Sequence, residues 1–229
     1  MNDSFDSRAL RLTDCYGQRF MKPGSYGYNI SPVPGHLVTE ERHWRIEVVE
    51  RTTESTMHQH MVVVKTEGAK FRAEPPELVI EAGDLVLWNC PEPDAAPYVV
   101  MGDHEFFSSH RLVNESGYSH AFGSAGDYDW ADAYGSDVAG VVRVRDPGCK
   151  DRADLQRWRT SLTKGTLVMI SEGRAEPRDV DIIAGQTVFF AVVKAPGISI
   201  TDRRLLSGRY EQEDSRARAG ASTAREGAS

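Results

Sequence analysis

The feature that most constrains the fold of this chain is an internal repeat that can be aligned without gaps. Residues 73–88 align with residues 175–190, and both segments contain an Ala-Gly pair at the same position. A second pair of segments, residues 20–28 and 122–130, also matches without a gap. Matches of this kind indicate that one structural unit occurs twice in the chain.

The repeated segments have the pattern of short β-strands. Runs rich in Val, Ile, Leu and aromatic residues are separated by Pro, Gly, Asn and Asp, and the Ala-Gly pairs fall where a tight turn would join two strands. This spacing predicts an all-β sandwich. Residues 151–160 are polar, with Leu155 and Trp158 at helical spacing, and predict one short helix.

The order of the matches predicts one complete unit and one divided unit. Residues 51–148 contain a first and a second half, whereas residues 1–50 resemble only the second half and residues 165–208 only the first. We therefore expect a complete central sandwich and a second sandwich assembled from the two chain ends. The alternatives are that both ends decorate the central sandwich, or that two chains exchange their end halves in a homodimer. We expect residues 149–164 to be a linker and residues 209–229 to be a disordered tail.

The central unit resembles the cupredoxin (plastocyanin-like) superfamily. The resemblance rests on residues 78–89, 96–100, 124–130 and 138–144, taken in this order and spacing. It implies a Greek-key β-sandwich. In blue-copper members of the family these segments carry two His ligands, a Cys and a weak axial Met.

The ligands of a type 1 blue-copper site are absent from this sequence. Tyr98 and Tyr134 replace the two His ligands, Ala131 or Asp132 replaces the Cys, and Val138 replaces the Met. The corresponding places of the divided unit hold Gly197, Ile30 and Val33. We therefore expect the fold of the family without its usual electron-transfer centre.

Charge and composition limit the partners and the compartment. The chain has 27 Lys and Arg against 34 Asp and Glu, which gives a net charge of −7 and argues against nucleic-acid binding. No apolar run approaches the roughly 20 residues of a membrane span, so we expect no membrane insertion. The acidic N-terminus and three scattered cysteines predict a cytoplasmic protein with reduced thiols.

The histidines predict a metal site at one end of the central unit. His58 and His60 open a strand, and side chains at i and i+2 of a strand point the same way, so both rings can bind one metal. By cupredoxin topology, the loop after the strand at residues 98–101 lies at the same end, and the parity of His120 directs its ring inward there. The predicted metal ligands are His58, His60, His104 and His110, with His120 as a spare ligand or an orienting group.

Copper is the first metal that this set suggests, because of the fold resemblance and the flanking Met57 and Met61, with iron or zinc as alternatives. Asp103 and Glu105 could serve as ligands or hold the rings in place. The structural alternative is a pair of exposed histidines at a strand start with no ligand.

Two functions of different classes follow from these features. The first is a copper- or iron-dependent oxidoreductase that acts on a small molecule at the histidine cluster. The second is a metal-free binding or assembly module, and a copper carrier with exposed ligands lies between the two. Phe106 and Phe107 bear on this choice, because two adjacent Phe residues cannot both face inward and one is expected to line a pocket or a partner surface.

Overall fold

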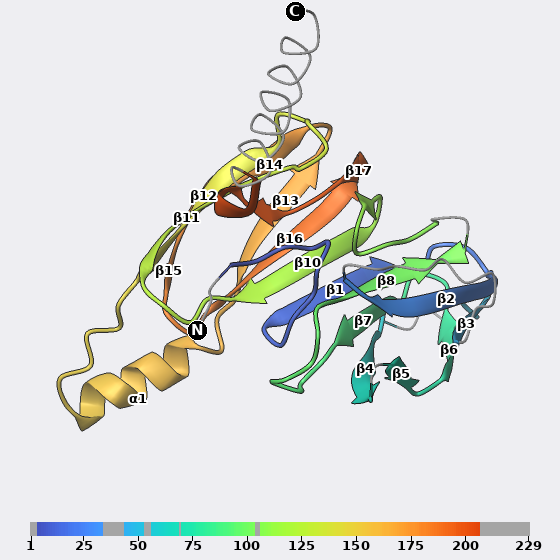
Figure 1. The fold of residues 1–229 in the computed structure, drawn as a ribbon, viewed down its shortest axis with the longest axis horizontal. Helices are drawn as coiled ribbons and strands as arrows, with labels where there is room; N and C mark the ends of the chain where they lie inside the picture. Colours follow the sequence, from blue (N-terminus) through green and yellow to red (C-terminus); the bar gives the residue numbers. More distant parts are fainter. Residues whose placement is uncertain (1–3, 34–43, 53–55, 69, 104–105, 207–229) are drawn as a thin grey trace, which may run out of the picture.

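The regular structure of the chain is mostly β-strand, as the sequence predicts (Figure 1). The computed structural model describes residues 4–33, 44–52, 56–68, 70–103 and 106–206. The first group of strands is β1 (Asp14–Arg19), β2 (Gly24–Pro32), β3 (Trp44–Val49), β4 (Gln59–Glu67), β5 (Lys70–Glu74), β6 (Glu77–Glu81), β7 (Leu85–Asn89) and β8 (Tyr98–Gly102). The predicted tail lies outside the described residues.

A second group of elements follows a similar order, with one helix and two short strands, Leu112–Val113 and Pro196–Ile198, in addition. Its members are β9 (Leu112–Val113), β10 (Ser116–Ala121), β11 (Gly126–Ala131), β12 (Ala139–Arg145), α1 (Arg152–Ser161), β13 (Thr166–Ser171), β14 (Arg174–Glu176), β15 (Asp179–Ile183), β16 (Thr187–Lys194), β17 (Pro196–Ile198) and β18 (Thr201–Asp202).

One long sheet joins the two groups. Its eight strands lie in the order β14-β13-β16-β10-β1-β7-β4-β5, so the first group supplies one half of the sheet and the second group the other half (Figure 1). Two four-stranded sheets, β6-β3-β2-β8 and β15-β12-β11-β18, accompany these halves, and β17 and β9 form a short ribbon.

The sheet order shows that the repeat is a tandem one. Both gapless matches have the same offset of 102 residues, from 73 to 175 and from 20 to 122. Gly83 and Gly185, which this offset relates, both have a φ of 96° in the turn before β7 or β16. Tyr16 and Tyr118 are related in the same way and pair with each other across β1 and β10. A pseudo-twofold axis therefore passes between these two tyrosines, perpendicular to the large sheet.

This pairing corrects the one that we expected from the sequence. We expected the strands of residues 51–148 to pair among themselves, and residues 1–50 to pair with residues 165–208. Instead β2 pairs with β8 and β3 with β6, whereas β11 pairs with β18 and β12 with β15. The second-half strands precede the first-half strands within each copy, so each copy closes with its own consecutive strands.

Both small sheets cover the same face of the large sheet. Tyr16 and Tyr118 are cross-strand partners and so point to one side. On that side Trp88, which stacks on Tyr16, meets Tyr28 of β2 edge to face. Trp130 of β11 meets Phe190 of β16 in the same manner.

The N-terminal segment runs between the two small sheets. Asp6 bridges to Thr201 of β18, and Leu10 bridges to Tyr98 of β8. Phe5 and Leu10 are both fully buried. This segment therefore closes the inner side of the molecule at the junction of the two copies.

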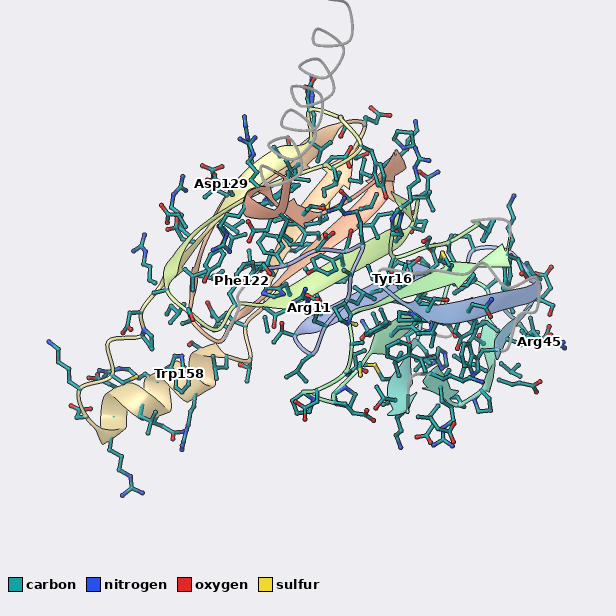
Figure 2. All side chains as sticks on the ribbon, in the orientation of Figure 1. Arg11, Tyr16, Arg45, Phe122, Asp129 and Trp158 are labelled. Atoms are coloured by element: carbon teal, nitrogen blue, oxygen red, sulfur yellow. The ribbon has the colours of Figure 1, made fainter. Side chains whose placement is uncertain are left out.

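The predicted helix is present as α1, and it packs on one end of the second copy (Figure 2). Asp151 caps its N-terminus by accepting a hydrogen bond from the Asp154 N–H at 2.8 Å. The Trp158 indole N–H donates to the Ala184 carbonyl at 2.7 Å, which holds α1 on the turn before β16. No helix among the described residues is long and apolar enough to cross a membrane.

Candidate functional site

His58 and His60 lie together at the start of β4, as the i, i+2 spacing predicts. Their ring centroids are 6.5 Å apart. His58 is exposed and His60 is partly buried. The Nε2 atom of His60 lies 2.9 Å from a carboxylate oxygen of Asp84, so one of its two ring nitrogens already has a partner. Met61 lies on the opposite face of β4 from His60, because side chains alternate along a strand.

Asp84 is the best-connected carboxylate of this region. It is 2% exposed and accepts hydrogen bonds from the His58 N–H at 2.9 Å and the Glu81 N–H at 3.2 Å, and the Arg51 guanidinium lies 2.5 Å away. Burial alone would raise its pKa, but these donors and His60 hold the pKa well below the usual range. Gln186 has the same place in the second copy, where its Oε1 accepts from the Ile183 N–H. The position therefore holds a turn in both copies.

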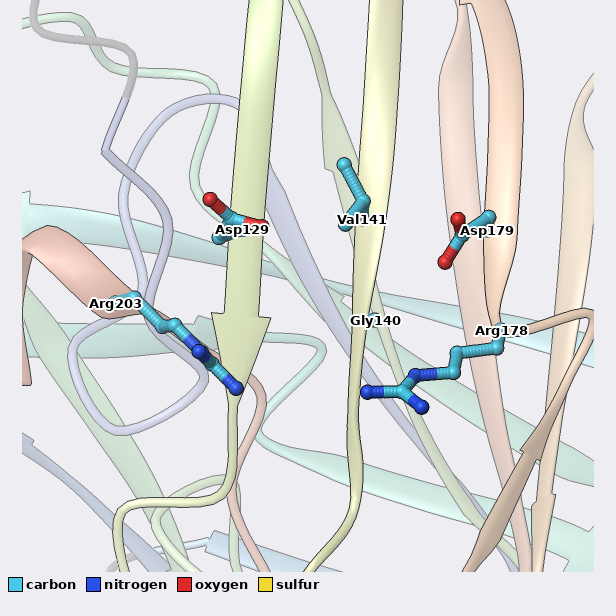
Figure 3. A pocket seen from close by; sticks show the side chains of 6 residues that line it. All are labelled: Asp129, Gly140, Val141, Arg178, Asp179 and Arg203. Carbon is cyan, nitrogen blue, oxygen red and sulfur yellow. The ribbon is translucent and has the colours of Figure 1, made fainter.

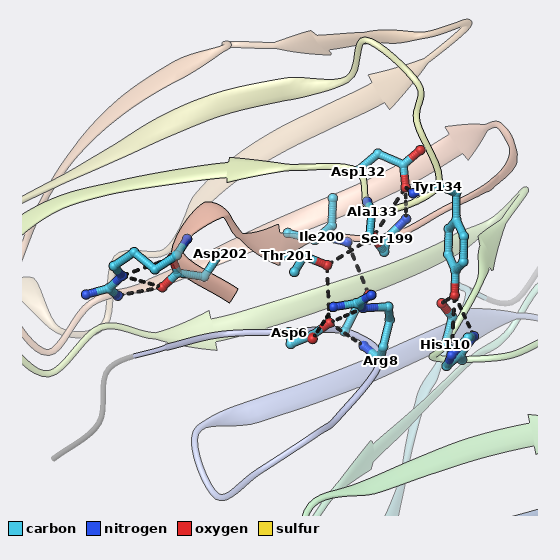
Figure 4. A network of polar contacts seen from close by, with 12 residues as sticks. Asp6, Arg8, His110, Asp132, Ala133, Tyr134, Ser199, Ile200, Thr201 and Asp202 are labelled. Atoms are coloured by element: carbon cyan, nitrogen blue, oxygen red, sulfur yellow. Dashed lines mark hydrogen bonds and ion pairs between the residues drawn. The ribbon is translucent and has the colours of Figure 1, made fainter. Parts of the chain in front are cut away.

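His110 contacts the second copy. Its Nδ1 lies 2.6 Å from the hydroxyl of Tyr134, and the guanidinium of Arg111 lies over the Tyr134 ring at 5.1 Å (Figure 4). Burial is the largest effect on Tyr134 and raises its pKa, while Arg8 and Arg111 oppose that rise.

The structure thus brings two of the four predicted metal ligands together. His104 and Glu105 lie outside the described residues. Asp103 accepts a hydrogen bond from the Gly27 N–H at 2.9 Å, which ties its loop to β2. Within the described ranges there is no group of three or more His, Cys, Asp and Glu side chains that could hold a metal ion.

His120 is a core residue at the junction of the copies. Its inward direction is as predicted, since its ring is 3% exposed and packs on Phe5 and Phe122. Its Nδ1 lies 2.7 Å from Asp14 Oδ1, and the Tyr118 hydroxyl donates to the same oxygen at 2.6 Å. The contacts of His120 are therefore made within the core, with β1 as well as with its own copy.

A buried polar network surrounds Asp132, which follows β11 (Figure 4). Its carboxylate accepts from the Ser199 N–H at 2.8 Å and the Tyr134 N–H at 3.1 Å. Burial raises its pKa, but these donors outweigh that effect and lower it. Nearby, Arg8 and Asp6 form an ion pair at 2.8 Å. Side-chain and backbone hydrogen bonds thus fill this end of the second copy.

Phe106 and Phe107 separate as predicted for two adjacent Phe residues. Phe107 is fully buried and stacks on Trp88. Phe106 is 51% exposed and packs on Tyr26. Phe106 also lines a groove of about 590 Å³, which confirms that one member of the pair lines a pocket.

This junction groove lies between the two copies. Side chains from the end of β1, from the turn before β10 and from the ends of β13 and β16 meet around it. Its lining residues are Gln18, Arg19, Met21, Lys22, Phe106, Val113, Asn114, Glu115, Ser171, Val193 and Lys194. Sequence reasoning found only Phe106, because the other residues come from segments whose proximity depends on the pairing of β1 with β10.

A second hollow of about 500 Å³ lies on the sheet of β11, β12 and β15 (Figure 3). Its lining residues are Asp129, Gly140, Val141, Arg178, Asp179 and Arg203. Figure 3 shows the two arginine side chains reaching toward one end of the hollow and the two aspartates toward the other. Asp179 pairs with Arg143 at 2.9 Å, so part of this charge is satisfied within the protein. The junction groove is therefore the better candidate.

Comparisons with family models, with curated proteins and with solved structures each find no match. The class of protein is defined by its fold, which is all-β and sandwich-like, with two groups of strands along one shared sheet. The site that the described residues define best is the junction groove.

Proposed function

We propose that this protein is a binding protein whose junction groove holds a small molecule with an apolar body and an anionic group. The observation that carries the proposal is the groove lining, which combines exposed apolar side chains with three cations and one carboxylate on a chain of net charge −7. Ligand sites are concave, mostly apolar and equipped with a few polar groups, and they form preferentially between structural units.

The apolar part of the groove comes from large hydrophobic side chains that are exposed to solvent. Met21, Phe106 and Val193 are all large exposed hydrophobic residues, and they lie around one concave surface. An apolar ligand body would remove their surface from water at about 25 cal/mol per Å². The volume of about 590 Å³ falls within the usual range for small-molecule pockets.

The charged part of the groove favours an anion. Arg19 donates to the Gly83 carbonyl at 2.6 Å and lies 3.6 Å from Glu115, and Lys194 pairs with Glu172 at 3.1 Å. Lys22 has no ion pair among the residues that the structure describes. Its ammonium is therefore the group that a carboxylate, sulfonate or phosphate of the ligand would meet first.

The test is calorimetric titration with octanoate and, as its counterpart of opposite charge, octylammonium. We expect octanoate to bind and octylammonium to bind at least several-fold more weakly. Lys22→Glu should weaken octanoate about threefold to tenfold, since an exposed charge contact contributes up to about 1 kcal/mol and reversal also adds repulsion. Phe106→Ala should weaken both ligands.

The control is Lys164→Glu, which makes the same charge change at an exposed residue outside the groove lining. Its affinity for octanoate should equal that of the wild type. Equal binding of both ligands, or a loss in Lys164→Glu as large as in Lys22→Glu, would show that net charge and not the groove governs binding.

The resemblance to cupredoxins is compatible with a binding protein of this kind. Successive strands β6, β7 and β8 alternate between the small and the large sheet, as Greek-key connections do. The Asp132 network lies where the resemblance places copper ligands. A cupredoxin-like scaffold that binds a ligand at the junction of its copies is consistent with both features.

A metal site at His58 and His60 is the second candidate, with copper first and iron or zinc as alternatives. The carboxylate of Asp84 at the His60 ring is the observation that favours it, because ligating histidines commonly bind a carboxylate through their other nitrogen. A metal roughly 2 Å from one nitrogen of each ring would hold the centroids about 5 Å apart at a tetrahedral angle, so the two rings, 6.5 Å apart here, would move closer together to share it. A copper-dependent oxidoreductase of small molecules would require this site.

Elemental analysis of untagged protein tests this candidate, with the His58→Ala/His60→Ala double variant in parallel. About one metal per chain, lost in the double variant, would support the site. Absence of bound metal after reconstitution with copper, iron and zinc, or equal metal content in both proteins, would refute it.

A further inference from the structure

The outer face of the eight-stranded sheet is apolar across both copies. The two small sheets and the N-terminal segment cover its inner face, whereas the outward side chains of six adjacent strands remain exposed or half-buried. Its larger apolar members are Met61, Val63, Leu85, Leu87, Leu167, Met169, Phe189 and Val193.

The centre of this face, where β1 meets β10, carries no charge apart from Arg19 at the end of β1. Gly17 of β1 pairs with Gly117 of β10, next to the pair of Tyr16 and Tyr118 at the pseudo-twofold axis. A Cβ on Gly117 would lie 2.6 Å from the Phe189 ring, and one on Gly17 would lie 3.0 Å from Leu87. Apolar side chains from the neighbouring strands therefore lean over two glycines, and any larger residue at either position would displace them.

The two ends of this face carry both signs of charge. On β5, Arg72 pairs with Glu74 at 2.6 Å, and on β14 the outward residues are Arg174 and Glu176. The pseudo-twofold axis relates β5 to β14, so the face has the same pattern at both ends. A second copy rotated onto it would meet apolar surface at the centre and opposite charges at the ends.

We propose that a second copy of the chain covers this face and forms a homodimer by packing sheet against sheet. An isologous interface needs one surface that is complementary to itself, and apolar surface between two ends that each carry both signs of charge meets that need. An acidic protein with a face that carries little charge at its centre is poorly suited to an anionic membrane or to nucleic acid.

The projected area of the sheet is smaller than a standard dimer interface, and protruding side chains enlarge it. Eight strands about 4.8 Å apart and about five residues long project an area of roughly 570 Å². The accessible surface exceeds the projected area because side chains protrude from the sheet. The result approaches the roughly 800 Å² per partner of a standard interface.

The test is the mass of the intact chain by light scattering and sedimentation over a range of concentrations. We expect twice the chain mass of 25.4 kDa for the wild type. Met169→Lys in the second copy and Met61→Lys in the first should each give a monomer, because a lysine would be buried without a partner at the interface. Circular dichroism and thermal melting show whether each variant is folded.

Val79→Lys is the matched control, since Val79 is 66% exposed but lies on β6 of a small sheet. It should remain a dimer. A monomeric wild type at about 100 μM, or a dimer that dissociates only in Val79→Lys, would overturn the proposal. Cosedimentation of a monomeric wild type with phosphatidylcholine vesicles would overturn it too and assign the face to a lipid surface. Titration of Lys22→Glu with octanoate tests the groove independently of the dimer. The ligand-binding proposal and the dimer proposal can therefore fail separately.

Discussion

At the scale of single residues, Asp84 makes charged contacts that its counterpart in the second copy does not make. The neutral Gln186 satisfies the equivalent turn in the second copy, so the charge of Asp84 serves contacts found only in the first. We expect Asp84→Asn to lower the free energy of unfolding by about 2 kcal/mol at pH 7, because the Arg51 and His60 contacts lose their charge. Urea unfolding from pH 3 to pH 8 measures this difference.

The pH dependence of this difference follows from the direction of the pKa shift. The pKa of Asp84 is lower in the folded protein than the value of about 3.9 in unfolded chains. Its contribution is therefore present above that value and is lost as the pH falls through the folded pKa. The difference in free energy of unfolding between wild type and Asp84→Asn should become smaller below about pH 4. Asp94→Asn, at an exposed residue, should unfold with the same free energy as the wild type. A difference in free energy of unfolding that stays constant from pH 3 to pH 8 would show that the charge of Asp84 does not cause it.

The sequence predicts the direction of a side chain well where alternation along a strand determines it. It predicts the direction poorly where a residue distant in the sequence determines it. Alternation along a strand placed His58 with His60, directed His120 inward and separated Phe106 from Phe107. The contact of His110 with Tyr134 depends instead on how the segment after β8 meets the loop after β11. Nothing local to either residue contains that information.

At the scale of elements, α1 depends on a few contacts at one end. None of its residues is buried, so its stability relies on the Asp151 cap and on Trp158. Trp158→Phe removes the N–H that donates to Ala184 but keeps a ring near Gly185. We expect a loss of about 1 kcal/mol that is confined to the helix, measured as faster amide hydrogen exchange in α1.

Arg157→Ala provides the comparison on the same helix. Its ion pair with Asp154 is exposed and screened by solvent, so it contributes little and α1 should exchange nearly as in the wild type. If Trp158→Phe accelerated exchange equally in α1 and in the central strands, the indole contact would support the whole fold and not the helix.

Strand positions could be predicted from the sequence, but strand partners could not. Alternation and turn residues are local, so the strand runs and the helix were found. Pairing depends on which strands meet across the chain, and the expected pairing of the end segments was wrong. The common offset of 102 residues in both matches is the signal that distinguishes a tandem repeat from a divided one.

At the scale of the whole molecule, the two copies share one sheet and one core. Buried residues of both copies belong to a single cluster, and β1 and β10 continue the hydrogen-bonded ladder between them. Two units joined in this way should unfold together. We expect calorimetry to show one transition whose calorimetric and van't Hoff enthalpies agree, and two resolved transitions would contradict this.

The junction also contains two cross-strand pairs that the pseudo-twofold axis relates, and exchanging one for the other tests whether β1 and β10 depend on each other. Asp14 faces His120 across β1 and β10, and the pseudo-twofold axis relates them to Ser116 and Gln18. Asp14→Ser and His120→Gln should each cost about 2–3 kcal/mol, because each leaves a buried polar partner unsatisfied. The double variant copies the arrangement of Gln18, which accepts from the Tyr16 hydroxyl at 3.2 Å. The double variant should therefore lose less free energy of unfolding than the two single variants lose together, by more than about 1 kcal/mol. Additive losses in urea unfolding would show that the two sides of the junction do not act as a pair.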